Sequence, residues 1–353
     1  MTANPYTDLP DRAFWRRAVA DVSAWEMDPL WTPRLAFAGS DRFVTYGSCF
    51  AQHIGQALKR HGYDWLNAEP SPPELPEILA KEFNYGVFSA RTQNIYTTSL
   101  FDQWLGWALD RGQVPEEVWE ENGRYFDPFR PTVEPRGFVS LDELVQARHA
   151  TLRAIRRSVV KADVLVFTLG LTEGWVNRRS GYVYASCPGT AYGEFDPELH
   201  SFVNFNYSQV RESLESALAR IRRVNTRMRV LLTVSPVPLT ATADNQHVVT
   251  ATTYSKSVLR AVAGDVVQSH DFVDYFPSYE YFTSMPFRAS LFDSNLRTAS
   301  RFGVDYALSK FLSVLPPASG EPSVPENLHS DDDVICEDAM LEAFAPGWGD
   351  RHP

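Results

Sequence analysis

Hydrophobic positions follow two alternating patterns along the chain, short apolar runs and longer segments with apolar residues at helical spacing. Runs of β-branched and aromatic residues predict strands at 43–47, 163–170, 229–234 and 271–274. Helical spacing predicts helices over 51–61, 98–110, 141–159, 208–225, 252–263 and 299–314. Because strands and helices alternate, we expect an α/β fold, a parallel sheet with helices on both faces and loop or subdomain insertions.

Capping residues and breaks in the pattern suggest where these elements begin and how the chain is divided. Ser140 and Ser208 are predicted to cap the helices that follow them. Residues 1–40 are expected to form an arm that packs on the core through its tryptophans, and 41–315 the main domain with excursions over 111–138 and 176–207. Residues 316–353 are acidic and rich in proline, which predicts a flexible tail.

Composition narrows the class of protein. The chain has 353 residues and a net charge of −11, which argues against nucleic acid as the main partner. Its three cysteines are far apart and form no CxxC pair, so neither a disulfide framework nor a zinc knuckle is expected. The first residues contain no apolar run, so we expect no membrane span and a cytoplasmic protein. Oligomeric state is not indicated.

The stretch 47–51, Gly-Ser-Cys-Phe-Ala, carries the clearest signal for chemistry. A predicted strand precedes it and a predicted helix follows it, so Ser48 and Cys49 lie in a turn at the carboxyl end of a strand. Open α/β sheets bind ligands at that edge, and a helix N-terminus lowers the pKa of a thiol and stabilises an oxyanion. The alternative interpretation makes Cys49 a small buried hydrophobe and Ser48 a helix cap.

A nucleophile of this kind needs a base, and the chain has eight histidines. His247 is the preferred candidate because it lies between a strand end and a helix, with His200 and His270 behind it. Glu173, which follows a buried strand with Thr172, could orient the histidine as the third member of a triad does. A surface or structural role for each of these side chains is the competing interpretation.

Other residues, most of them in a loop region rich in aromatics, could bind an oxyanion or a substrate. The oxyanion candidates, which are equally typical of turns, are Asn84, Gly86, Asn94 and Gly170. Tyr96 and Trp175 would suit a carbohydrate or acyl pocket, although aromatic residues more often form core. No P-loop, spaced GxGxxG or HExxH motif is present, so no metal site is expected and no cofactor is required.

These residues resemble the GSCFA family, which takes its name from the five residues 47–51. Further blocks that look like the family are 84–88 (Asn-Tyr-Gly-Val-Phe), 94–97 (Asn-Ile-Tyr-Thr), 168–173 (Thr-Leu-Gly-Leu-Thr-Glu), 233–238 (Thr-Val-Ser-Pro-Val-Pro) and 254–260 (Tyr-Ser-Lys-Ser-Val-Leu-Arg). The likeness covers roughly residues 40–314. It implies a relationship to the SGNH/GDSL hydrolases and hence a flavodoxin-like sheet.

The hydrolase pattern can be carried over position by position. Aligned in frame, Cys49 takes the place of the serine in Gly-Asp-Ser, and a slip of one residue would favour Ser48. The oxyanion glycine would correspond to Gly86 or its neighbours, and Thr172 replaces the usual asparagine. Thr298 stands where the resemblance implies a histidine, so either His247 takes that role or the chemistry differs.

The resemblance implies acyl-group chemistry, as an esterase or O-acyltransferase, on a carbohydrate or other small molecule. It also implies a link to bacterial surface polysaccharide, and a thiol nucleophile could accept an acyl group from acyl-CoA. The alternative is a catalytically degenerate SGNH-like module that binds a glycan or a partner protein. The missing histidine favours that alternative.

Overall fold

The computed structural model describes residues 4–110, 114–321 and 337–345 and is built on a five-stranded parallel sheet. Its strands are β1 (Arg42–Gly47), β2 (Asp64–Trp65), β5 (Val164–Leu169), β9 (Arg229–Val234) and β10 (Val273–Phe276), in the order β10-β9-β5-β1-β2. Counted along the chain, this is the order 2-1-3-4-5 of flavodoxin-like sheets. The α/β parallel fold expected from the sequence is therefore confirmed.

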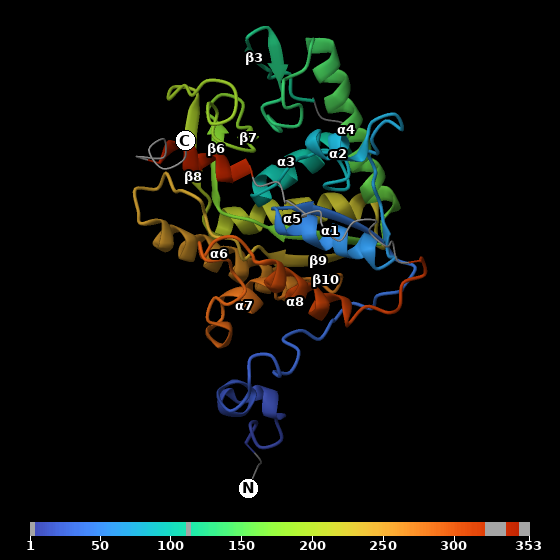
Figure 1. Cartoon of the computed structure of the whole chain (residues 1–353), viewed down its shortest axis with the longest axis vertical. Coiled ribbons are helices and arrows are strands. Elements are labelled where there is room, and N and C mark those ends of the chain that lie inside the picture. Colours follow the sequence, from blue (N-terminus) through green and yellow to red (C-terminus); the bar gives the residue numbers. More distant parts are fainter. Residues whose placement is uncertain (1–3, 111–113, 322–336, 346–353) are drawn as a thin grey trace.

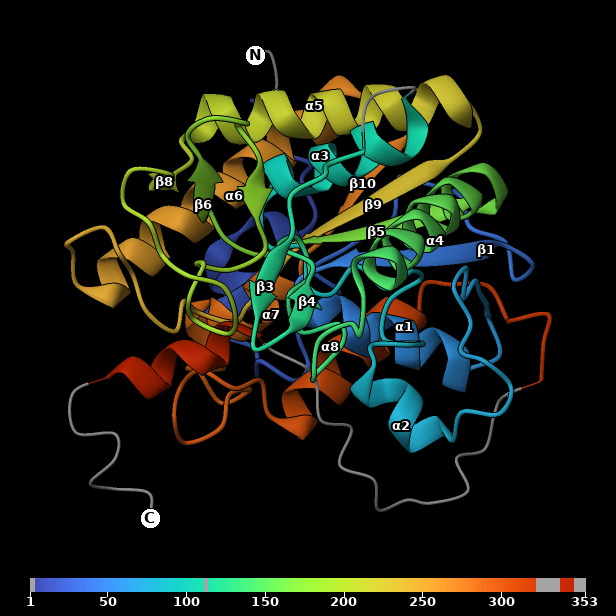
Figure 2. The same ribbon diagram turned by 90° about the horizontal axis from the view of Figure 1, so that it is seen from above.

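Helices cover both faces of the sheet (Figures 1 and 2). One face carries α1 (Phe50–Arg60), α7 (Ser278–Thr283) and α8 (Arg301–Leu312), whose buried residues form one apolar cluster with that face. The other face carries α3 (Thr98–Leu109), α4 (Leu141–Lys161), α5 (Tyr207–Val224) and α6 (Val248–Ser269), which form a second cluster. Among the described residues, no helix is long and apolar enough to cross a membrane.

Two antiparallel insertions and several short helices complete the chain. The hairpin of β3 (Trp119–Glu121) and β4 (Arg124–Phe126) lies in the first predicted excursion. The second excursion forms a small sheet of β6 (Glu173–Asn177), β7 (Val183–Tyr184) and β8 (His200–Asn204), in the order β7-β6-β8. The short helices are α2 (Glu77–Glu82), η1 (Asp11–Ala13), η2 (Arg16–Ala20), η3 (Met285–Phe287) and η4 (Glu337–Phe344).

Two helix predictions need correction. The cap of α5 is Asn206, not Ser208, because Asn206 and Gln209 each accept a hydrogen bond from the backbone amide of the other. Helix α6 is longer than predicted, and its first residue follows His247, whose ring accepts a hydrogen bond from the Val249 amide. Valine and threonine at the start of α6 have low helix propensity, which hid this first turn in the sequence pattern.

The N-terminal segment meets the core through two of its tryptophans. The Trp31 side chain is buried against Phe276 and Phe311, and Trp25 packs on Tyr306 in an edge contact. Trp15 stays 61% exposed, and the first residues (blue in Figure 1) extend away from the sheet. Most of the predicted flexible tail, including 322–336 and 346–353, lies outside the described residues.

A buried ion cluster ties the first insertion to α4. The Asp127 carboxylate is fully buried and accepts hydrogen bonds from Arg130 (2.9 Å) and Arg148 (2.9 and 3.2 Å). Burial alone would raise the pKa of Asp127, but the two guanidinium groups outweigh it and hold the pKa below its usual range. The folded state favours the charged form of Asp127. The ion cluster therefore stabilises the fold at pH values above the unfolded pKa of this carboxyl, and that stabilisation is lost as pH falls through the lower pKa of the folded state.

Replacing Asp127 with asparagine should therefore be strongly destabilising. Two buried guanidinium groups would lose their counter-charge, and we expect the free energy of unfolding to fall by about 3–5 kcal/mol near neutral pH. Urea denaturation of the wild type and of Asp127→Asn measures the difference, which should shrink as pH is lowered below about 4. Asp305→Asn, at an exposed position of α8, is the control and should change stability by less than about 0.5 kcal/mol.

Candidate functional site

The site begins where β1 meets β5, at the point where the strand order of the sheet reverses. Gly47 ends β1 with a φ of +124°, and a Cβ there would lie 2.3 Å from the Thr168 carbonyl oxygen. Only glycine permits this approach. The next amide, of Ser48, donates to the same Thr168 carbonyl at 3.0 Å and so fixes the turn on β5.

Ser48 and Cys49 follow in the turn and are both almost fully buried. Ser48 is only 1% exposed, and its hydroxyl has no hydrogen-bond partner among the described residues. Cys49 is the N-cap residue of α1 and already has right-handed helical angles (φ −50°, ψ −32°). Both Cys49 and Cys187 are free thiols, and burial raises the pKa of Cys187 to about 11.

The segment 94–96 closes the space between the ends of β1 and β5. The Ile95 amide donates to the Gly47 carbonyl at 2.8 Å, and the Tyr96 carbonyl accepts from the Gly170 and Leu171 amides at 3.1 and 3.0 Å. The Asn94 side chain accepts a hydrogen bond at 3.3 Å from Gln52 on the first turn of α1. Of the residues expected from sequence, Asn94, Tyr96 and Gly170 therefore lie beside the Ser48–Cys49 turn.

Gly170 is the second close contact of the site. A Cβ at this position would lie 3.1 Å from the Ser48 Cβ and 2.9 Å from the Tyr96 carbonyl oxygen. Its own carbonyl accepts a hydrogen bond at 2.6 Å from Lys256 on α6, a side chain that is only 2% exposed. Gly170 thus separates Ser48 from a buried lysine.

Thr172 and Glu173 belong to a hydrogen-bond network with the loop before α6. Thr172 donates to Asn204 at 2.7 Å, and Asn204 donates to Asp244 at 2.9 Å. Thr242 of the same loop donates to the Glu173 carboxylate at 2.6 Å. Burial raises the pKa of Glu173, partly offset by its hydrogen bonds to the loop. Glu173 thus holds the loop that ends at His247, and no contact between these two residues is recorded.

The three histidines considered as bases contact other parts of the chain. His247 caps α6 through Nδ1, and His270 pairs with Glu215 at 2.7 Å. His200 is 4% exposed, its Nδ1 accepts from the Asp196 amide, and burial lowers its pKa. Within the described residues none of them has a recorded contact with Ser48 or Cys49, so the base stays a prediction.

Three further candidates contact residues other than Ser48 and Cys49 in the described part of the chain. Asn84 has a φ of +60° after α2, and its buried side-chain oxygen has no partner among the described residues. Gly86 follows with a φ of +70°, and its carbonyl lies 3.5 Å from the Lys59 ammonium near the end of α1. Trp175 on β6 packs against Phe202 on the insertion sheet. Their roles stay predictions.

The arrangement can stabilise negative charge at the turn. The Ser48 amide is occupied, and the Gly170 amide donates to Tyr96. No acceptor is recorded for the Cys49 and Phe50 amides among the described residues, and both lie at the N-terminus of α1. Unpaired amides at a helix N-terminus are suited to an oxyanion. Cys49 therefore offers a thiol and a donor group at the same point.

Sequence reasoning missed Lys256, Ser255 and Gln52. Ser255 accepts a hydrogen bond from the Thr172 amide at 2.9 Å, so consecutive residues of α6 hold the end of β5. A lysine on a predicted amphipathic helix is normally exposed, which is why the pattern gave no signal. Both α6 residues do belong to the block 254–260, and this was the available clue.

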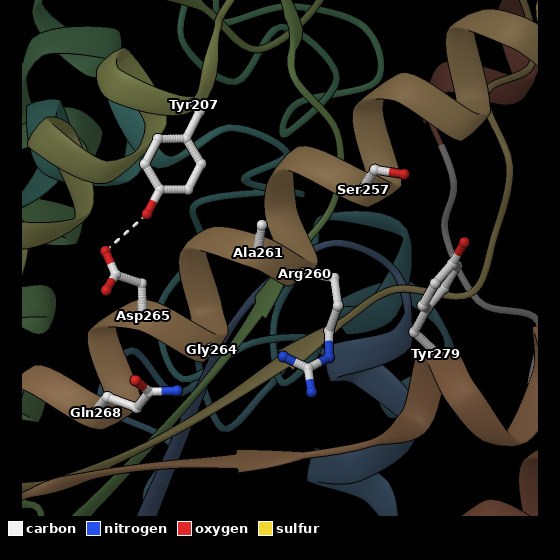
Figure 3. A pocket seen from close by; sticks show the side chains of 8 residues that line it. All are labelled: Tyr207, Ser257, Arg260, Ala261, Gly264, Asp265, Gln268 and Tyr279. Atoms are coloured by element: carbon white, nitrogen blue, oxygen red, sulfur yellow. Dashed lines mark hydrogen bonds between the residues drawn. The ribbon is translucent and has the colours of Figure 1, made fainter.

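A cavity of about 600 Å³ lies elsewhere, on the surface formed by α5, α6 and α7 (Figure 3). Tyr207 donates to Asp265 across it at 2.6 Å, and the Arg260 guanidinium pairs with Glu280. Its charged groups are thus already engaged, and no residue of the Ser48–Cys49 turn lines it. We therefore place the chemistry at the turn and not in this larger hollow.

The fold and the turn together define a flavodoxin-like α/β protein with a thiol and a hydroxyl at the switch point of its sheet. The GSCFA family model matches residues 42–311, and the chain belongs to the GSCFA family. The match begins with β1 and ends in α8, so it includes every strand of the central sheet. No curated protein matches the sequence.

One solved structure that the chain is similar to is an acetyl xylan esterase (Est2A) from the rumen bacterium Butyrivibrio proteoclasticus. The two share 12% sequence identity with a TM-score of 0.29, over 79% of this chain. The match spans 64% of the esterase chain. A likeness at this level is a similarity and carries no argument about the reaction.

The contact at Gly170 gives a testable consequence. Gly170→Ala would place a methyl group 3.1 Å from the Ser48 Cβ and 2.9 Å from the Tyr96 carbonyl oxygen, so the turn must shift. We expect a loss of about 1–3 kcal/mol in the free energy of unfolding, measured by urea denaturation. Gly106→Ala, in α3, is the control, because this glycine also has no positive φ and an added Cβ would lie no closer than 3.5 Å to its nearest packing neighbour, Arg220. An equal loss in both variants would contradict the packing argument.

Proposed function

We propose that the protein carries out acyl-group chemistry, as an esterase or O-acyltransferase, on a carbohydrate or other small molecule. The observation that carries the proposal is Cys49, a buried thiol at a strand–turn–helix at the switch point, beside helix amides with no recorded acceptor. A thiol so placed has the nucleophile, the positive end of a helix and an oxyanion site in one turn. Ser48, in the same turn, is the second candidate nucleophile.

The reaction would proceed in two balanced steps. The Cys49 sulfur attacks the carbonyl carbon of an ester or thioester, a base takes the thiol proton, and the amides of Cys49 and Phe50 hold the oxyanion. The C–O or C–S bond to the leaving group breaks, and the protonated base gives its proton to that group. A hydroxyl of the acceptor, or water, then attacks the carbonyl carbon of the Cys49 thioester while the base takes its proton. The C–S bond to Cys49 breaks, and the base returns the proton to the sulfur. His247, held by the loop that Glu173 binds, is one candidate base.

Transfer to a glycan hydroxyl fits the family's link to bacterial surface polysaccharide, with acyl-CoA as the acyl donor. Tyr96 is the candidate contact for the acceptor because its backbone lies beside the turn, where its carbonyl accepts hydrogen bonds from the Gly170 and Leu171 amides. Trp175, half-buried on β6, could extend an aromatic surface for a sugar ring. Polar contacts from Thr172 and Asn84 stay predictions, since the Thr172 hydroxyl is bonded to Asn204 and Asn84 lies apart from the turn.

A non-catalytic binding module is the second candidate function. Two observations favour it: Thr298 stands in place of the expected histidine, and its side chain accepts a hydrogen bond from Asn295 instead of serving the turn. Ser48 and Cys49 are also both closed off in this structure. In this case the scaffold would recruit a glycan or a partner protein without turning it over.

An acyl adduct on Cys49 is the direct test. Incubation with p-nitrophenyl acetate and, separately, with acetyl-CoA should add an acetyl group to the intact protein, and peptide mapping should place it on Cys49. Cys49→Ala should lose the adduct and lower ester hydrolysis by about 100-fold or more, because the nucleophile is removed. Cys187→Ala, which removes the other described thiol, is the matched control and should keep both. Full activity in both Cys49→Ala and Ser48→Ala would refute the proposed function.

A further inference from the structure

The geometry of α1 places a histidine one helical turn from the proposed nucleophile. Cys49 has right-handed helical angles, and the Gln52 amide donates to its carbonyl at 3.0 Å, so helical geometry includes Cys49 itself. His53 is therefore at position i+4 from Cys49, where Cβ atoms on a helix lie about 5–6 Å apart. Helical side chains lean toward the N-terminus, which directs His53 back over the turn that holds Cys49.

We propose that His53 is the general base and acid paired with Cys49, a proposal that rests on the acyl chemistry proposed above. His53 lies on the same helix face as the thiol and is half-buried, with its ring in an edge contact with Phe50 at 5.9 Å. Hydrogen bonds between a base and its nucleophile often tighten only in the complex with substrate.

No other described histidine lies within one helical turn of Cys49 along α1. His61 binds the Ala57 carbonyl through Nδ1 at the far end of α1. His247 lies eight residues before Ser255, so along α6 it is about 12 Å from the hydrogen bond that Ser255 makes to the end of β5. His149 is exposed on α4, a helix of the opposite face of the sheet from α1. His53 alone among these shares an element with Cys49 at a reactive spacing.

One polar group beside Cys49 that is unpartnered within the described part of the chain, the Ser48 hydroxyl, indicates that the turn receives a ligand. Ser48 is 1% exposed, and its hydroxyl has no partner among the described residues. Its side chain lies against Gly170, which follows the end of β5. On the other side Gln52 and Asn94, both buried, hydrogen-bond to each other at the first turn of α1. His53 therefore completes a polar site that already contains a thiol, a hydroxyl and two amides.

The proton transfers follow from this pairing. The His53 imidazole accepts the thiol proton as the new C–S bond forms, and it donates this proton to the leaving oxygen as the C–O bond breaks. In the second half the imidazole accepts the proton of the acceptor hydroxyl or water as its oxygen bonds to the acyl carbon. The proton then returns to the Cys49 sulfur as the thioester C–S bond breaks.

Thiol alkylation tests the pair without requiring any acyl substrate. Iodoacetamide is added to the folded protein at a fixed pH near 7.5, and the rate of modification at Cys49 is followed by peptide mass spectrometry, with Cys187 as the internal reference. A paired imidazole raises the thiolate fraction, so His53→Gln should lower the Cys49 rate by roughly tenfold relative to Cys187. Hydrolysis of p-nitrophenyl acetate should fall by about 100-fold or more in the same variant.

Matched variants separate a chemical role from a structural one. His61→Gln removes a histidine from the same helix and should leave both rates unchanged. Added imidazole should restore part of the ester hydrolysis in His53→Ala, a rescue that a merely structural role would not give. If His53→Gln does not fold, which urea denaturation shows, the rescue experiment is carried out on His53→Asn.

The outcomes distinguish this inference from the proposed function. Slower alkylation of Cys49 in His53→Gln without any acyl adduct in the wild type would support the pair and refute the acyl chemistry. Acyl adducts with an alkylation rate unchanged in His53→Gln would support the chemistry and overturn the role of His53. Loss of hydrolysis in His247→Gln, with His53→Gln fully active, would also overturn it and assign the base to α6.

Discussion

The close approach of the end of β1 to the end of β5 is the constraint on which the site depends. Gly47 makes it sterically possible, and the hydrogen bond from the Ser48 amide to the Thr168 carbonyl fixes it. The neighbouring strand end is fixed in turn by Tyr96, whose carbonyl accepts from two successive amides. Because both strand ends are held, the N-terminus of α1 has one orientation. This orientation in turn sets the directions of the Cys49 thiol and of the nearby amides.

Much of the fold could be predicted because its signals are local. The apolar run at 163–170 is buried along its length as β5, and the strand at 229–234 has the predicted bounds. Parallel central strands have few polar positions, so their pattern is easy to read. Helix ends were less accurate, since Asn206 and His247 act as caps through contacts that spacing alone does not reveal.

Part of the neighbourhood of the turn was predicted because its residues follow directly from a strand end. Ser48 and Gly170 were singled out because turns after predicted strands gather at one edge of a parallel sheet. Asn94 was singled out as a turn residue among aromatics, and it lies beside them. Lys256 could not be found in this way, because its burial depends on how far α6 extends past the ends of β5 and β9. The base stays a prediction, because the sequence pattern favoured His247 from its place between a strand end and a helix, and spacing along the chain does not show which imidazole reaches Cys49.

The four segments that form the site are far apart in the sequence. Residues 47–53, 94–96, 170–172 and 255–256 meet through hydrogen bonds between the ends of parallel strands and the helices beside them. Contacts of such long sequence separation form slowly, because the loops between them must be closed first. During synthesis the turn with Cys49 emerges from the ribosome some two hundred residues before the lysine that holds Gly170. The thiol is therefore accessible in the nascent chain for much of synthesis, and it becomes enclosed only when the second half of the sheet has assembled.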